Sequence, residues 1–114
     1  MGIRMVMRFT KTITCLRCRK QAERYIGSYS GLCEPCMSLH RLEGREAVRL
    51  VATAKRHGKL PRADSLPCAD CGGKARDYDH RDYMKPLDVQ AVCHGCNVRR
   101  GTAFDSVYRP AAGA

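Results

Sequence analysis

The pattern of apolar and polar positions predicts one long amphipathic helix, from Met37 to His57. Its apolar side chains recur at helical spacing, at Leu39, Leu42, Leu50, Val51 and Ala54. Gly58 follows this segment directly and supplies a C-terminal stop signal. The first half of the chain is therefore expected to be organised around a single helix.

A different pattern marks the N-terminus, where every second residue is apolar. These residues are Ile3, Met5, Met7 and Phe9. The alternation predicts a strand with one buried face. Farther along, "KLPRADSLP" contains two prolines and is typical of a linker. We therefore expect an N-terminal module over 1–58, a linker over 59–67, a second module over 68–104 and a tail over 105–114.

The eight cysteines change this picture, because 114 residues with two phenylalanines and no tryptophan cannot build a large apolar core. All eight fall in Cys-x-x-Cys pairs, namely Cys15/Cys18, Cys33/Cys36, Cys68/Cys71 and Cys93/Cys96. The start "MGIRMVMRFTKTIT" lacks the apolar run of a signal peptide, which predicts a cytoplasmic protein with reduced thiols. A disulfide framework and a thioredoxin-like redox pair remain the alternatives.

Two such pairs supply the four thiolates that tetrahedral zinc prefers, so the sequence predicts two structural zinc ions. Pairing in sequence order leaves gaps of 14 residues (19–32) and 21 residues (72–92), and each gap fits a β-hairpin. A shell shared between distant pairs is the alternative, at the cost of a longer loop closure.

Each Cys-x-x-Cys pair is expected to form a tight turn, which we call a knuckle. The two halves form an internal repeat of a first knuckle, a hairpin, a second knuckle and a helical segment. In "CEPCMSLHRLEG" and "VCHGCNVRRG" the second cysteine is expected to open the helix, where free backbone N–H groups favour a thiolate. This order resembles the treble-clef zinc finger over 15–57 and 68–104. The predicted fold is therefore a small zinc-stabilised α+β chain with two tandem treble-clef or zinc-ribbon-like modules.

Charge divides the chain unevenly. Residues 1–60 hold 13 Lys and Arg against 4 Glu, a net charge of +9, whereas residues 61–114 hold 8 against 7 Asp, a net charge of +1. Arg41, Arg45 and Arg49 follow one another at steps of four on the predicted helix, which indicates a binder of nucleic-acid phosphates. The alternative is an ordinary solvated helix face. Membrane binding is not expected, because no bulky apolar side chains accompany the charges.

The second module carries polar residues beyond its cysteines. Asp79 and His80 lie in the predicted hairpin, and Asn97, the chain's single asparagine, follows Cys96 directly. Oxygen atoms of Asp79 and Asn97 could hold Mg²⁺ or Mn²⁺, and His80 could accept a proton from water attacking a phosphodiester. Structural roles are the alternative. Asp79 would then pair with Arg81 or Arg76, His80 would bond a backbone carbonyl and Asn97 would cap a helix turn.

The segment "CADCGGKARDYDHRDYMKPLDVQAVCHGCNVRRG" (68–101) resembles the zinc-knuckle branch of the HNH endonucleases, and more narrowly small bacteriophage-encoded proteins with HNH-like motifs. The resemblance implies a ββα-metal site built on a treble clef. It makes Asp79 and Asn97 the ligands of the catalytic cation and His80 the general base. Asp88 falls where the family has the asparagine that positions the base.

What the resemblance implies for function is a metal-dependent endonuclease or nicking enzyme acting on DNA, with Arg99 and Arg100 as phosphate contacts. A phage-encoded protein of this kind would work in the cytoplasm of its bacterial host. The alternative is a non-catalytic regulator or inhibitor that uses the zinc frame to bind nucleic acid or a host protein. Hairpin tyrosines could stack on unpaired bases or belong to the core, at Tyr25, Tyr29, Tyr78 and Tyr83.

Overall fold

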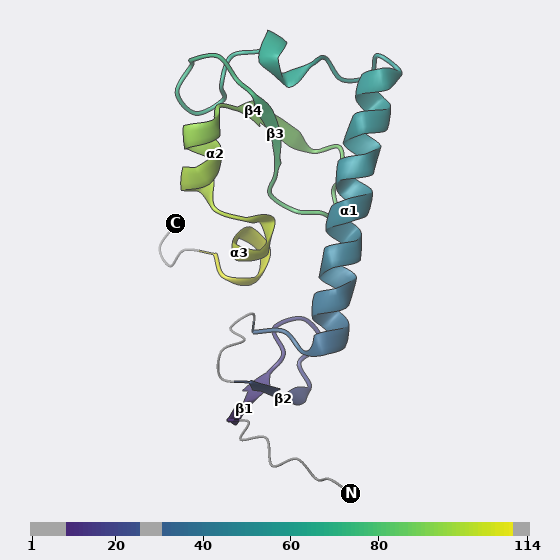
Figure 1. Ribbon diagram of the computed structural model, residues 1–114, viewed down its shortest axis with the longest axis vertical. Coiled ribbons are helices and arrows are strands. Elements are labelled where there is room, and N and C mark those ends of the chain that lie inside the picture. Colours follow the sequence, from purple (N-terminus) through teal and green to yellow (C-terminus); the bar gives the residue numbers. More distant parts are fainter. Residues whose placement is uncertain (1–8, 26–30, 111–114) are drawn as a thin grey trace, which may run out of the picture. The chain divides into compact units, whose positions relative to one another are not determined.

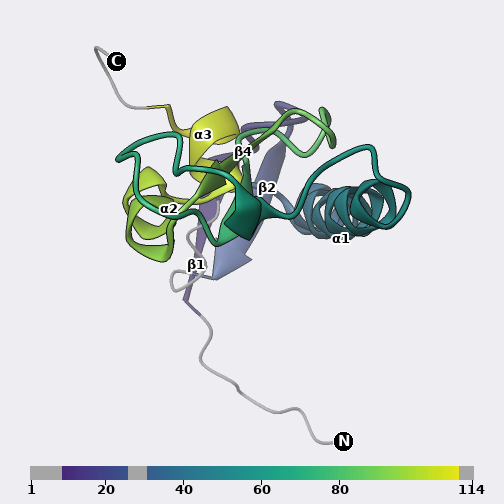
Figure 2. The same cartoon turned by 90° about the horizontal axis from the view of Figure 1, so that it is seen from above.

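A computed structural model describes residues 9–25 and 31–110 of the chain. The chain forms two compact units, one ending at Leu39 and the other beginning at His40. The boundary lies within the long helix α1 (Glu34–Arg56), which Figure 2 shows almost end-on as a regular coil. The predicted α+β class is confirmed, with two separate two-stranded sheets and three α-helices in the described residues (Figure 1).

In the first unit, strands β1 (Thr10–Thr14) and β2 (Gln21–Tyr25) pair in antiparallel register and flank the first cysteine pair. Placing both strands of this hairpin in the 19–32 gap was wrong, because the Cys15/Cys18 knuckle is itself the turn. The N–H of Cys15 donates to the Lys20 carbonyl at 2.9 Å, and the N–H of Arg19 donates back to Cys15 at 2.9 Å.

The predicted N-terminal strand and Tyr29 fall largely outside the described residues, which begin at residue 9 and omit 26–30. Phe9 is described and is exposed rather than buried.

In the second unit the expected hairpin is confirmed inside the 72–92 gap. Strands β3 (Asp77–His80) and β4 (Val89–Val92) are antiparallel, and His80 pairs with Val89. The Cys68/Cys71 knuckle repeats the turn of the first one, since the N–H of Cys68 donates to Gly73 O and the N–H of Gly72 donates to Cys68 O. Gly72 has φ 79° and its counterpart Arg19 has φ 67°, so both turns require a left-handed residue after the second cysteine.

Helices begin earlier in the second knuckles than expected. Helix α1 starts at Glu34, directly after Cys33, and α2 (His94–Arg100) starts directly after Cys93. The second cysteine of each knuckle therefore lies within the first helical turn. For α2 the reason is a cap, because the Cys93 sulfur accepts the N–H of Cys96 at 3.4 Å.

The segment expected as a linker packs onto the β3–β4 hairpin. A short 3-10 turn (Ala63–Ser65) contributes Ala63 to a buried cluster with Ala75 and Ala91. The Tyr78 hydroxyl donates to the Pro61 carbonyl at 2.7 Å. At the other end, helix α3 (Ala103–Tyr108) extends into the residues expected as a tail.

The apolar core is small. Among the described residues, the largest fully buried side chains are Leu32, Val92 and Cys15, and two of the leucines predicted on the inner face of α1, Leu39 and Leu42, are exposed. So few buried groups leave little hydrophobic stabilisation, which makes the cysteine clusters the main candidates for holding each unit together. Within the described ranges, no helix combines the length and apolarity needed to cross a bilayer.

Candidate metal centres and the adjoining polar site

The eight cysteines form two clusters of four, Cys15/Cys18/Cys33/Cys36 and Cys68/Cys71/Cys93/Cys96, with all sulfur atoms of a cluster within 4.8 Å of one another. Pairing in sequence order is thereby confirmed, and all eight thiols are free of disulfides. The Cys18–Cys33 sulfurs are 3.9 Å apart and the Cys71–Cys93 sulfurs 3.8 Å apart. Tetrahedral Zn–S bonds of about 2.3 Å imply sulfur separations of about 3.8 Å, so both clusters are compatible with a structural zinc ion.

Backbone N–H groups surround the first thiol of each cluster. Burial alone would raise the pKa of the Cys15 thiol, but backbone donors outweigh it and bring the pKa to about 5. Cys68 is affected in the same way, and its pKa falls to about 6. The knuckle turns therefore prepare one thiolate in each cluster before any cation binds.

The last thiol of each cluster shows the opposite shift. Its hydrogen bond to the neighbouring thiol and its burial raise the pKa of Cys36 to about 12, and the same two causes raise that of Cys96 to about 12. Four sulfurs this close cannot all ionise on their own, because each thiolate repels the next. A divalent cation removes that conflict, which is the electrostatic argument for zinc in both clusters.

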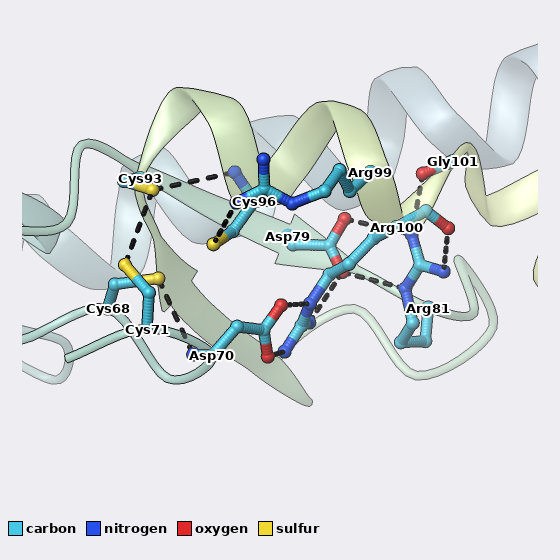
Figure 3. A network of polar contacts seen from close by, with 10 residues as sticks. All are labelled: Cys68, Asp70, Cys71, Asp79, Arg81, Cys93, Cys96, Arg99, Arg100 and Gly101. Carbon is cyan, nitrogen blue, oxygen red and sulfur yellow. Dashed lines mark hydrogen bonds and ion pairs between the residues drawn. The ribbon is translucent and has the colours of Figure 1, made fainter. Parts of the chain in front are cut away.

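Beside the second cluster lies a network of ion pairs that joins the knuckle, the hairpin and α2 (Figure 3). Asp79 on β3 accepts from Arg81 Nε at 2.7 Å, from Arg81 Nη2 at 3.0 Å and from Arg100 Nη1 at 2.9 Å. Arg100 also holds both oxygens of Asp70, each at 2.6 Å. Asp70 lies inside the Cys68/Cys71 knuckle, so Arg100 connects this cysteine knuckle to Asp79.

Arg81 also closes the end of α2. Its guanidinium donates to the carbonyls of Arg100 at 3.0 Å and Gly101 at 2.8 Å, two acceptors that the helix leaves unpaired. The hydrogen bond from Arg100 lowers the pKa of the Asp70 carboxyl. Because the pKa of Asp70 is lower in the folded state, its pairing with Arg100 stabilises the fold at pH values above the unfolded-state pKa. This stabilisation is lost as the pH falls through the folded-state pKa.

His80 is 9% exposed, and its Nε2 lies 2.8 Å from the Pro86 carbonyl oxygen. A carbonyl can only accept, so Nε2 carries the hydrogen and donates it, which leaves Nδ1 of the neutral ring as an acceptor. The sequence assigned the positioning of His80 to Asp88, but the observed contact comes from Pro86. Asp88 is exposed, directly precedes β4, and donates its backbone N–H to Lys85 O.

One pocket of about 410 Å³ brings together the three residues expected at a catalytic centre, Asp79, His80 and Asn97. His94 lines the same pocket. Within residues 9–25 and 31–110, the two cysteine clusters are the only groups of three or more Cys, His, Asp or Glu whose ligand atoms come so close together. Asp79 and Asn97 therefore line the same pocket, but they do not belong to a cluster of three or more such ligand residues.

Some of the structural contacts predicted as alternatives for Asp79 and His80 are observed. Asp79 pairs with Arg81 as that alternative predicted, and also with Arg100, while Arg76 approaches Asp77 instead, at 3.5 Å. His80 does bond a backbone carbonyl. A structural contact and a catalytic role are compatible for His80, since its second nitrogen has no part in the contact with Pro86.

The predicted basic residues differ in their surroundings. Arg41 and Arg45 are exposed, and no carboxylate pairs with either of them within the described part of the chain. Arg49, by contrast, donates to both oxygens of Glu46 at 2.9 and 2.6 Å. Arg99 donates to the Cys96 sulfur at 3.1 Å, and Arg100 belongs to the Asp79 network. Two arginines of the helical stripe are thus available to an outside anion.

Comparison with known proteins adds no family to this description: no protein-family model, curated protein or solved structure matches the chain.

Proposed function

We propose that the second unit is an HNH-like site for metal-dependent hydrolysis of DNA phosphodiesters. The observation that carries the proposal is that Asp79, His80 and Asn97 line one pocket beside a four-cysteine cluster. The order of knuckle, hairpin and capped helix over residues 68–100 also supports a treble clef with a ββα site. The first unit repeats the knuckle turn, which supports a tandem arrangement.

The chemistry follows from the orientation of His80. Because Nε2–H is held by Pro86 O, Nδ1 is the nitrogen that accepts a proton from an attacking water. The His80 ring also packs against Tyr83 in a T-shaped arrangement, with ring centroids 5.7 Å apart, which restricts its rotation. A base held in one tautomer and one orientation needs no rearrangement before proton transfer.

The oxygen donors fit a hard cation. Asp79 accepts three N–H contacts, two of them on Oδ2, so one lone pair of Oδ1 remains for a metal. Asn97 adds a second oxygen donor in the same pocket. A bound Mg²⁺ or Mn²⁺ would supply Lewis-acid stabilisation of charge on the phosphate and the leaving oxygen. Arg81 and Arg100 would hold the Asp79 carboxylate in a fixed orientation.

We predict that the zinc-loaded protein nicks supercoiled plasmid when Mg²⁺ or Mn²⁺ is added. His80→Ala should slow nicking by about 10²- to 10⁴-fold, since it removes the proton acceptor, and Asn97→Ala should raise the metal concentration required. The control is His57→Ala, which changes an exposed histidine outside the pocket and should nick at the rate of the unmodified protein. Equal nicking by His80→Ala and the unmodified protein would assign the activity to a contaminant.

The engagement of Asp79 by two arginines favours a second function, a non-catalytic zinc module that binds nucleic acid or a host protein. In that function Asp79 is a counterion that shapes the hairpin and α2. Clean DNA binding by the unmodified protein, His80→Ala and Asn97→Ala, with no nicking by any of them, would establish this alternative.

A DNA-binding role for α1 can be tested through its salt dependence. We expect the double variant Arg41→Gln with Arg45→Gln to reduce the slope of the logarithm of the DNA association constant against the logarithm of the salt concentration by about 1.8. Each lost phosphate contact reduces this slope by about 0.9. Arg49→Gln should change the slope less, since Glu46 already neutralises Arg49. Affinities for a short duplex at several salt concentrations provide the measurement. An unchanged slope in the double variant would make the stripe a solvated face.

A further inference from the structure

A second hollow adjoins the pocket of the proposed phosphodiester site. Its volume is about 600 Å³, and it is lined by His40, Arg41, Gly44, Arg45, Val48 and Tyr83. We call it the α1 groove. Val48 and Tyr83 also line the pocket that contains Asp79, His80 and Asn97, so the two hollows adjoin along these two side chains.

The α1 groove has an apolar, aromatic surface. Tyr83 packs against the ring of His40 with centroids 5.1 Å apart, and Val48 beside them is exposed. Its volume is within the range of about 300–1,000 Å³ that is usual for small-molecule sites. A flat, apolar group of the size of a nucleobase therefore has both the space and the aromatic surface it needs.

Charge complementarity identifies the rest of the ligand. Arg41 and Arg45 stand one helical turn apart on the rim, and no carboxylate lines the groove. Both guanidinium groups lack a carboxylate partner among the described residues. An aromatic floor with two available guanidinium groups fits a base and its flanking phosphates better than it fits an apolar peptide.

The close approach of Tyr83 to α1 depends on Gly44. A Cβ atom at this position would lie 2.8 Å from Tyr83 Cε2, so any larger residue forces the ring to move. Gly44 costs helix stability relative to alanine, yet it lies in the middle of α1. The glycine thus allows the position of the Tyr83 ring that the groove requires.

We propose that the α1 groove binds one unpaired nucleotide of a single-stranded or locally opened DNA, with its base against Tyr83 and its phosphates against Arg41 and Arg45. The proposal rests on the proposed function for its choice of nucleic acid as ligand. It adds the substrate class, because a paired base cannot reach an aromatic ring without leaving its stack. It also places the strand beside His80, since the groove and the catalytic pocket share Tyr83.

The test uses a single-stranded oligonucleotide containing 2-aminopurine, whose fluorescence falls when it stacks, and the zinc-loaded full chain without added Mg²⁺ or Mn²⁺. We expect quenching with the unmodified protein and with Tyr83→Phe, which keeps the ring. Tyr83→Leu should abolish the quenching and weaken binding by about 5- to 150-fold. Gly44→Ala should also reduce the quenching while leaving the helix intact, because alanine favours helix more than glycine does.

Several results would overturn the subsite. These are a lack of quenching with the unmodified protein, equal affinity of Tyr83→Leu, or the same quenching of 2-aminopurine paired in a duplex. A dimer that Tyr83→Leu dissociates in sedimentation would assign the groove to a second copy of the chain. These results are distinguishable from a failure of the nuclease proposal. Quenching without plasmid nicking would support the subsite and reject catalysis, whereas nicking without quenching would support catalysis and reject the subsite.

Discussion

Replacing Cys96 by serine is expected to lower the zinc content from two ions per chain to one and to abolish the cooperative unfolding of the second unit. Structural zinc sites contribute about 10–16 kcal/mol of apparent binding free energy, which equals or exceeds the whole stability of an ordinary domain, about 5–15 kcal/mol. The buried cluster around Cys68, Val92 and Cys96 contains two of the predicted zinc ligands, so loss of the ion should also open this part of the core. Elemental analysis and thermal unfolding followed by circular dichroism measure both effects.

The matched control is Ala69→Ser, which places the same side chain at an exposed position between the two cysteines of the first knuckle of this unit. It should keep two zinc ions and the unfolding temperature of the unmodified protein. A Cys96→Ser variant that loses one zinc ion and still unfolds cooperatively at the original temperature would contradict a structural role for the metal. Cys36→Ser offers the corresponding test for the first unit.

The two cysteine clusters were predictable because their geometry is local. Two residues between cysteines bring both thiols to one point of a tight turn, and only two such turns are needed for a tetrahedral shell. Hydrophobic periodicity likewise located most of α1. Its first turn was missed because no apolar residue marks it, and Cys33 rather than Cys36 precedes the helix.

The position of the first hairpin was harder to predict. Nothing in "TKTITCLRCRKQAERY" distinguishes a knuckle that ends before a hairpin from one that forms its turn. The knuckle before β2 turns through Arg19 at positive φ, a conformation that sequence signals associate with glycine. In the Cys68/Cys71 knuckle, Gly72 occupies the equivalent position. A comparison of the two halves could therefore have revealed the shared turn.

The residues of the polar site could be predicted from the sequence, but the contacts that they make could not. Asp79, His80 and Asn97 were selected from their side-chain chemistry and from the resemblance to HNH endonucleases, and they do line one pocket. The partners that hold them were not evident, because Arg100 reaches Asp70 across 30 residues and Pro86 takes the contact expected of Asp88. Such pairings depend on how the hairpin folds against α2, which no local pattern encodes.

The same network makes Asp79 the residue whose neutralisation should cost the most outside the zinc clusters. Its side chain is 6% exposed, and that of Arg100 is 14% exposed. Burial of this kind is tolerated because each charge has a partner, and removal of one partner typically costs about 3–5 kcal/mol. Arg100 keeps Asp70 when Asp79 is lost, which places the expected cost at the lower end of that range.

We therefore expect Asp79→Asn to lower the free energy of unfolding of the second unit by about 3 kcal/mol, measured by urea titration in zinc-saturated buffer. Asp77→Asn is the matched control on the same strand, since its side chain is 40% exposed and meets Arg76 at 3.5 Å only; it should change stability by less than about 1 kcal/mol. Equal losses in the two variants would reject the network as a source of stability. If Asp79→Asn instead leaves stability unchanged and abolishes Mg²⁺-dependent nicking, the carboxylate serves the catalytic cation alone. Loss of both would mean that the arginines hold in place the same oxygen atoms that the cation uses, which joins the folding of the hairpin to the chemistry proposed for it.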